Sequence, residues 1–244
     1  MSYRIGLDLG STAIKVVLAE NRALRWCRKV PTAPGQEALA MGLVQACLDE
    51  LGLSMSDIES IAATGYGKKL ASGAGRTVDE ISANALGMFT LSGGRCRTII
   101  NIGGQDLKVI NLDENGRIAD FKMNDKCAAG TGRFFEQAAR ILDTPLEQFG
   151  EMSRNARETL ELNSTCVVFA ESEMVSLLAK GVDKESIIKG LHNSVARRIA
   201  NLLGRQSLKG DIYLDGGPAQ NPGIGIHGIA VVPVNFNGAE QPRC

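Results

Sequence analysis

Short apolar runs, broken by polar or glycine-containing turns, fill the first 30 residues of the chain. Residues 3–9 (YRIGLDL), 13–19 (AIKVVLA) and 24–30 (LRWCRKV) are three such runs. Runs of this length and composition between tight turns are typical of β-hairpins. The pattern therefore predicts three antiparallel strands.

The spacing of the apolar residues changes after residue 35. From Gln36 to Leu51, apolar side chains recur every three or four positions, which predicts a helix. A fourth strand is expected at 58–64, before a glycine-rich turn, and a second helix at about 79–91. The apolar face of the first helix is expected to consist of Leu39, Leu43, Ala46, Cys47 and Leu51.

The same pattern then begins again. Three more strands are predicted at 97–103, 106–112 and 117–123, with a turn over residues 114–116. Helices follow at about 130–142, 146–153, 169–180 and 184–206, then a strand at 211–215 and an edge strand at 229–234.

This return of the pattern predicts an α/β chain of two duplicated lobes with little sequence repetition. The boundary is placed near residue 95, which gives a first lobe of 1–95 and a second of 96–244. A chain of 244 residues is long enough for two such lobes.

Composition excludes several classes of protein. The 27 basic and 27 acidic side chains cancel, so no global field favours nucleic acid or an anionic membrane. No apolar run approaches the roughly 20 residues of a membrane helix. The first residues, MSYRIGLDLG, do not resemble a signal peptide. We therefore expect a cytoplasmic protein that binds neither nucleic acid nor membrane.

The first strand ends in a turn suited to phosphate. Gly10 permits a tight backbone turn with accessible N–H groups, and the hydroxyls of Ser11 and Thr12 add donors. Asp8 can hold Mg²⁺ through water, so we assign it a catalytic role. We also expect Lys15 to contact the nucleotide.

The corresponding turn of the second half repeats this chemistry. Gly103 and Gly104 supply the flexible backbone. Gln105 and Asp106 are catalytic candidates because they could orient water or metal for hydrolysis.

A third glycine turn follows the strand at 211–215. There Gly216 and Gly217 leave a flat backbone surface for a purine and ribose, and Asn221 is a further candidate contact. Any one of these turns is ordinary hairpin chemistry. Together they resemble the phosphate-1, phosphate-2 and adenosine motifs of the actin, sugar-kinase and Hsp70 superfamily. That resemblance implies a ribonuclease H-like ATPase fold with Mg²⁺–ATP between the lobes.

Two cysteines lie in polar loops that enter helices. Cys127 belongs to KCAAGTGRF, where Gly130, Thr131 and Gly132 open a helix and could approach the phosphates. Cys166 belongs to STCVVFAESE. From the residues alone, a metal ligand and a buried thiol are both open for each. For Cys27, Cys47 and Cys96 we expect burial, and for Cys244 an exposed thiol.

These segments, with DLGST, NIGGQD and DGGPAQNP, resemble the activator components of 2-hydroxyacyl-CoA dehydratases. The wider family includes the ATP-binding subunits of benzoyl-CoA reductase (the BadF/BadG/BcrA/BcrD type). The resemblance implies a homodimer in which Cys127 and Cys166 of each copy hold one [4Fe–4S] cluster. It also implies a dehydratase or reductase partner protein, and a ferredoxin or flavodoxin as electron source.

Two other functions stay open on sequence grounds. One is a small-molecule kinase of the same fold that acts on a sugar or carboxylate. The other is a non-redox clamp that binds nucleotide and changes shape. The chain also departs from the family after residue 222, where GIGIHGIAVVPVNFNGAEQPRC stands in place of a helix, a strand and a closing helix. We therefore expect a shortened C-terminal element.

Overall fold

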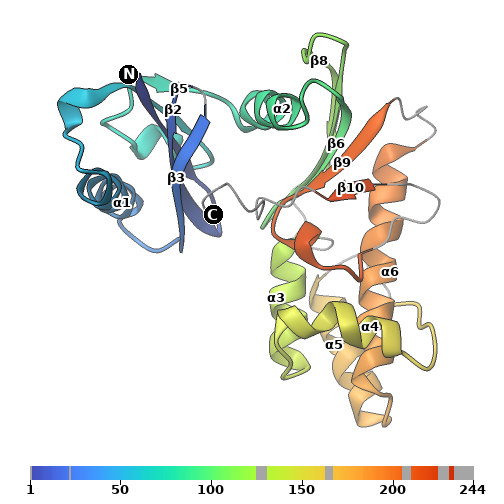
Figure 1. The fold of residues 1–244 in the computed structure, drawn as a ribbon. Coiled ribbons are helices and arrows are strands. Elements are labelled where there is room, and N and C mark those ends of the chain that lie inside the picture. The colour runs from blue at the N-terminus through green and yellow to red at the C-terminus, as the bar shows by residue number, and fades with distance from the viewer. Residues whose placement is uncertain are drawn as a thin grey trace. The chain divides into compact units, whose positions relative to one another are not determined.

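The described part of the chain divides into two units (Figure 1). The computed structural model describes residues 2–21, 23–124, 131–162, 167–204 and 210–224, and the backbone of 231–233. The first unit contains the described residues up to Asn84, and the second begins at Ala85. The sequence-based boundary at residue 95 lies between α2 (Glu80–Leu91) and β6 (Cys96–Ile102).

Among the described residues, the first unit has one five-stranded sheet in the order β3-β2-β1-β4-β5. Strands β1 to β3 form the expected antiparallel meander, and β4 joins β1 in parallel. The elements are β1 (Tyr3–Leu9), β2 (Ala13–Glu20), β3 (Ala23–Pro31), α1 (Gln36–Leu51), β4 (Ile58–Thr64) and β5 (Arg76–Thr77), with short 3₁₀ turns at Met55–Asp57 and Lys68–Leu70.

The core of the first unit follows from strand alternation. Every second side chain of β1 and β2 is buried because successive side chains point to opposite faces. Helix α1 covers this apolar face. The buried side chains of α1 are Ala40, Leu43, Val44, Cys47 and Leu48, so the buried stripe is rotated from the predicted one, in which Leu39, Ala46 and Leu51 are only partly buried.

The second unit repeats this topology with a larger helical layer. Its five described strands are ordered β10-β9-β6-β7-β8, with β6, β7 and β8 antiparallel and β9 parallel to β6. The remaining elements are β7 (Leu107–Leu112), β8 (Ile118–Met123), α3 (Gly132–Ile141), a 3₁₀ turn (Leu146–Gln148), α4 (Phe149–Asn155), α5 (Val167–Ala179), α6 (Lys184–Leu203), β9 (Asp211–Asp215), a 3₁₀ turn (Pro218–Gln220) and β10 (Val231–Pro233).

Helices α3 to α6 pack against this sheet and bury its central strands. Ile100, Leu107 and Leu214 from three strands share one core with Phe134 of α3 and Phe149 of α4. Helix α6 is the longest element and begins at a side-chain cap, in which the Asp183 carboxylate accepts a hydrogen bond from the Ser186 N–H at 2.8 Å.

The predicted strands and long helices are present within one to three residues at each described end. Strand β5 was missed because two residues carry no periodicity. The predicted helix at 146–153 is a 3₁₀ turn followed by α4. Strand β10 takes the edge position predicted from Pro233. Cys127, Gly130, Cys166 and Cys244 lie outside the described residues.

Candidate functional site

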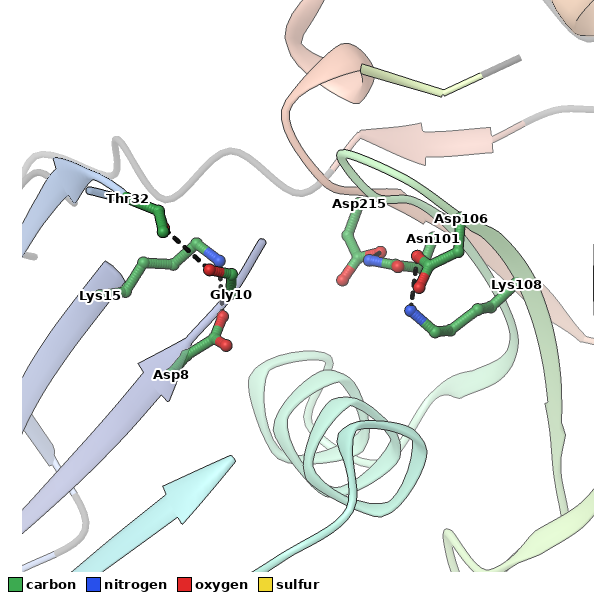
Figure 2. A network of polar contacts seen from close by, with 8 residues as sticks. All are labelled: Asp8, Gly10, Lys15, Thr32, Asn101, Asp106, Lys108 and Asp215. Atoms are coloured by element: carbon green, nitrogen blue, oxygen red, sulfur yellow. Dashed lines mark hydrogen bonds and ion pairs between the residues drawn. The ribbon is translucent and has the colours of Figure 1, made fainter. Parts of the chain in front are cut away.

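The β1–β2 turn of the first unit has the tight geometry that phosphate binding requires (Figure 2). The Gly10 N–H donates to the Ala13 carbonyl at 3.1 Å, and a Cβ on Gly10 would lie 2.7 Å from that same oxygen. The Thr32 hydroxyl donates to the Gly10 carbonyl at 2.8 Å. Only glycine fits here, as the sequence predicts.

A carboxylate and a lysine face each other across this hairpin. Asp8 and Lys15 are register partners, and the Lys15 Nζ lies 2.5 Å from the Asp8 Oδ2 (Figure 2). Their side chains are 31% and 46% exposed. Because both groups keep solvent access, this pair can rearrange at small energetic cost.

Beside Asp8, strand β4 ends in a second close approach. Thr64 is the parallel register partner of Asp8, and Gly65 has φ +89°. A Cβ on Gly65 would lie 2.6 Å from both the Asp8 carboxylate and the Leu9 carbonyl. The hydroxyls of Thr12 and Thr64 are buried and have no hydrogen-bond partner among the described residues. The turn therefore carries unsatisfied polar groups next to its carboxylate.

The β6–β7 turn of the second unit has the same backbone. The Gly103 N–H donates to the Asp106 carbonyl at 2.8 Å, and a Cβ on Gly103 would collide with the Asp106 carboxylate. Lys108 Nζ lies 2.6 Å from Asp106 Oδ1 (Figure 2). Both side chains are only 8% exposed, so this charge pair is buried, unlike the Asp8 pair.

Strand β9 supplies a further carboxylate at the same edge. Asn101 and Asp215 are parallel register partners, and the Asn101 carboxamide donates to the Asp215 carboxylate at 2.6 Å (Figure 2). Gly216 follows with φ +97°, and a Cβ there would strike the Ile102 carbonyl. Gly217 is in the right-handed helical region, and a Cβ added to it would meet no described atom within 4 Å.

Helix α3 begins directly on the β6–β7 turn. The Gly132 N–H donates to the Gly103 carbonyl at 2.8 Å, and the Arg133 N–H donates to the Gly104 carbonyl at 3.1 Å. Thr131 is the N-cap residue of this helix, but its side chain does not cap the helix. The carbonyls of the turn take that role, so Gly132 is committed to the turn itself.

The third predicted loop is held by a residue that the sequence did not single out. The Asn221 Nδ2 lies 3.0 Å from Nε2 of His192, and its Oδ1 accepts from the Gly223 N–H at 2.9 Å. His192 packs against the rings of Phe135 and Phe149. Burial, and then the nearby charge of Lys189, lower the pKa of His192 to about 4. The neutral ring therefore accepts from Asn221 near neutral pH.

Lys108 and His192 were both missed from the sequence. Lys108 had a weak signal, since it follows Asp106 by two positions and so shares its strand face. His192 and Asn221 are far apart in the chain, and no local pattern joins them.

Cys27, Cys47 and Cys96 are buried, as expected. Cys47 and Cys96 are free thiols, whereas Cys27 is disulfide-bonded, which the sequence did not predict. Burial raises the pKa of Cys47 and of Cys96 to about 11, which makes these thiols inert. The described residues contain no group of three or more His, Cys, Asp or Glu side chains placed to hold a metal, and Cys127 and Cys166 are not among those residues.

Two glycine turns of one geometry, each beside a carboxylate on a duplicated sheet, define a nucleotide-binding fold of the actin, Hsp70 and sugar-kinase type. Comparison with known proteins confirms this expected fold. Residues 5–230 match the BadF/BadG/BcrA/BcrD ATPase family, and the chain belongs to that family.

Similar proteins include dehydratase activators. The chain is 44% identical over 223 residues to the activator of lactoyl-CoA dehydratase from Anaerotignum propionicum, covering 91% of this chain and 85% of that protein. It superposes with a TM-score of 0.88 and 36% identity on the crystal structure of component A of the (R)-2-hydroxyglutaryl-CoA dehydratase of Acidaminococcus fermentans, covering 97% and 93% of the two chains. The activator of the 2-hydroxyisocaproyl-CoA dehydratase from Clostridium difficile, with bound ADPNP, gives a TM-score of 0.82 at 38% identity, covering 91% and 82%.

None of the helices within the described residues is both long and apolar enough to cross a membrane.

Proposed function

We propose that this chain hydrolyses Mg²⁺–ATP to drive the transfer of single electrons to a 2-hydroxyacyl-CoA dehydratase-type partner. The observation that carries the proposal is the pair of equivalent turns, Gly10 to Ala13 and Gly103 to Asp106, each closed by the same backbone hydrogen bond. Membership of an ATPase family supports hydrolysis, and similarity to dehydratase activators supports the choice of partner.

The residues have separate roles in hydrolysis. In the first unit, Asp8 holds Mg²⁺ through water, while Gly10, Ser11, Thr12 and Lys15 contact phosphate oxygens. The buried Thr12 hydroxyl without a partner among the described residues supports this assignment, because a phosphate oxygen would accept a hydrogen bond from it.

In the second unit, the backbone of Gly103 and Gly104 contacts phosphate, and Gln105 and Asp106 act on water and metal. Gly130, Thr131 and Gly132 follow β8 in the chain and lead into α3, and in this proposal they approach the nucleotide phosphates. Gly216, Gly217 and Asn221 form the nucleoside loop, which His192 holds in place.

The redox part of the proposal rests on Cys127 and Cys166. Cys166 directly precedes α5 and Cys127 precedes α3 by five residues, and these two helices pack against each other in the second unit. Two thiolates from each chain of a homodimer match the four that a [4Fe–4S] cluster requires. Bound there, the cluster would supply one-electron chemistry between a ferredoxin or flavodoxin and the partner protein.

Anaerobic purification with iron and sulfide counts tests the redox part. We expect four irons per dimer in the wild type and a loss of most iron in Cys127→Ser and in Cys166→Ser, while Cys96→Ser keeps the wild-type content. An iron-free wild-type dimer, or a full complement in both variants, contradicts the proposal. ATP hydrolysis is assayed separately, and Asp8→Asn is expected to reduce kcat by about 100-fold or more, because the water that holds the metal loses the carboxylate that binds it.

A further inference from the structure

A side-chain contact links the catalytic candidate Gln105 to the first turn of α3. The Gln105 carboxamide lies beside the Arg133 guanidinium, and assigning the amide oxygen to the side that faces Arg133 gives both polar atoms of the amide a suitable neighbour. In this orientation the oxygen accepts hydrogen bonds from both terminal guanidinium nitrogens of Arg133, at 2.9 and 3.1 Å.

Backbone hydrogen bonds hold Gln105 and Arg133 close to each other. The hydrogen bonds from the Gly132 and Arg133 N–H groups to the Gly103 and Gly104 carbonyls place the first turn of α3 against the β6–β7 turn. Gly132 fits closely there, since a Cβ on it would lie 3.4 Å from both the Gly103 oxygen and the Gly104 Cα. Arg133 therefore reaches Gln105 from a fixed base.

The contact with Arg133 selects one of the two orientations that the Gln105 carboxamide could adopt. The terminal torsion of Gln is broad and nearly two-fold, so its oxygen and nitrogen exchange places easily. A guanidinium carries donors only, and two charge-assisted hydrogen bonds to one oxygen select a single orientation. The amide –NH₂ group then points away from Arg133, and Gln105 presents donors rather than an acceptor.

We propose that Arg133 is a positioning residue for ATP hydrolysis, which fixes Gln105 so that its –NH₂ group donates to a phosphate oxygen or to the attacking water. The inference rests on the proposed ATPase function. It assigns Gln105 the role of a donor, and it leaves proton acceptance from water to other groups of the turn. Arg133 acts through Gln105 and does not itself contact the nucleotide.

A double-mutant cycle tests this assignment. We expect Arg133→Met to lower kcat about tenfold while KM for ATP and the affinity for ADP change less than about twofold. In a Gln105→Ala background the same substitution should have no further effect on kcat. Arg133→Lys should restore part of the rate, because one ammonium replaces one of the two hydrogen bonds. Arg140→Met, at an exposed arginine in the last turn of α3, is the matched control and should leave kcat unchanged.

Additive losses in the double variant, or a fall in ADP affinity with Arg133→Met, would show that Arg133 acts on the nucleotide directly and would overturn the proposal. A second readout does not depend on turnover. The side-chain –NH₂ resonances of Gln105, assigned by their loss in Gln105→Ala, should shift in Arg133→Met and not in Arg140→Met. If the wild type hydrolyses no ATP, the proposed function fails, while unmoved resonances refute the Arg133–Gln105 contact itself.

Discussion

The β1–β2 and β6–β7 hairpins share a backbone and differ in where they carry charge. Gly10 corresponds to Gly103, because each donates its N–H across the turn in the same way. The cross-strand pair Asp8 and Lys15 corresponds to Asn101 and Lys108. In the first hairpin the carboxylate lies on the first strand, whereas in the second it lies after the turn, at Asp106.

The parallel strand beside each hairpin, β4 or β9, also differs in whether its last residue carries a carboxylate. Thr64 is the partner of Asp8, and Asp215 is the partner of Asn101. The glycine that follows each, Gly65 or Gly216, has a positive φ. The backbone is therefore the same in the two hairpins, while the charged side chains occupy different positions. The first ion pair is partly exposed and the second is buried, so the first can adjust to a ligand while the second keeps its turn rigid.

The largest expected difference between the two hairpins is in how much stability is lost when the lysine of each, Lys108 or Lys15, is replaced. Lys108→Met should lower the free energy of unfolding by about 3–5 kcal/mol, because it leaves the buried Asp106 carboxylate without its cation. Urea unfolding followed by far-UV circular dichroism measures this loss. The double variant Asp106→Asn/Lys108→Met should recover much of it. A loss below about 1 kcal/mol would show that the buried pair does not hold the second turn.

The two units should also respond differently to acid. The chain has two histidines, at 192 and 227, so the first unit has none among its described residues. The folded-state pKa of His192, about 4, lies below its ordinary value of 6.5, so the unfolded state binds more protons between these values. The contribution of His192 to the free energy of unfolding is fully present above pH 6.5. It is lost as the pH falls toward 4, and the loss amounts to about 3 kcal/mol.

Hydrogen exchange measured by mass spectrometry at several pH values, corrected for intrinsic rates, separates the units. Peptides from α6 should lose protection on acidification by more than peptides from β1 and β2. In His192→Gln this extra loss should disappear. Equal losses in the wild type and the variant would mean that His192 contributes nothing to the acid response.

The glycines after the parallel strands should be equivalent. Gly65→Ala and Gly216→Ala should each cost about 2–3 kcal/mol, because a Cβ meets a carbonyl oxygen in a backbone of positive φ. Gly181→Ala is the control, since its φ is +79° but no atom lies within 4 Å of the added carbon, and only the strain of about 1 kcal/mol remains. Thermal unfolding measures all three. Losses at Gly65 and Gly216 no larger than at Gly181 would refute the close approach.

The hairpins and their glycines were predictable because their signals are local. A short apolar run that ends in glycine needs no distant partner to be recognised, and Gly10, Gly103 and Gly216 each directly follow such a strand. The contacts that fix the turns were not predictable. Arg133 meets Gln105, and Asn221 meets His192, only because the helices fold back on the second sheet. Burial of Lys108 likewise depends on the layers that cover β7.

The smallest expected effect is at Lys15. Lys15→Met should change the free energy of unfolding by less than about 1 kcal/mol, because the Asp8–Lys15 pair is partly exposed and screened by solvent. Trp26 lies in β3 of the same unit, and it is the one tryptophan of the chain, so its fluorescence follows unfolding of the first unit. The nucleotide should separate the two lysines further. If Lys15 contacts phosphate, Lys15→Met weakens ATP binding about tenfold while stability stays near that of the wild type. A loss of stability as large as that of Lys108→Met would erase the distinction between an adjustable first turn and a rigid second one.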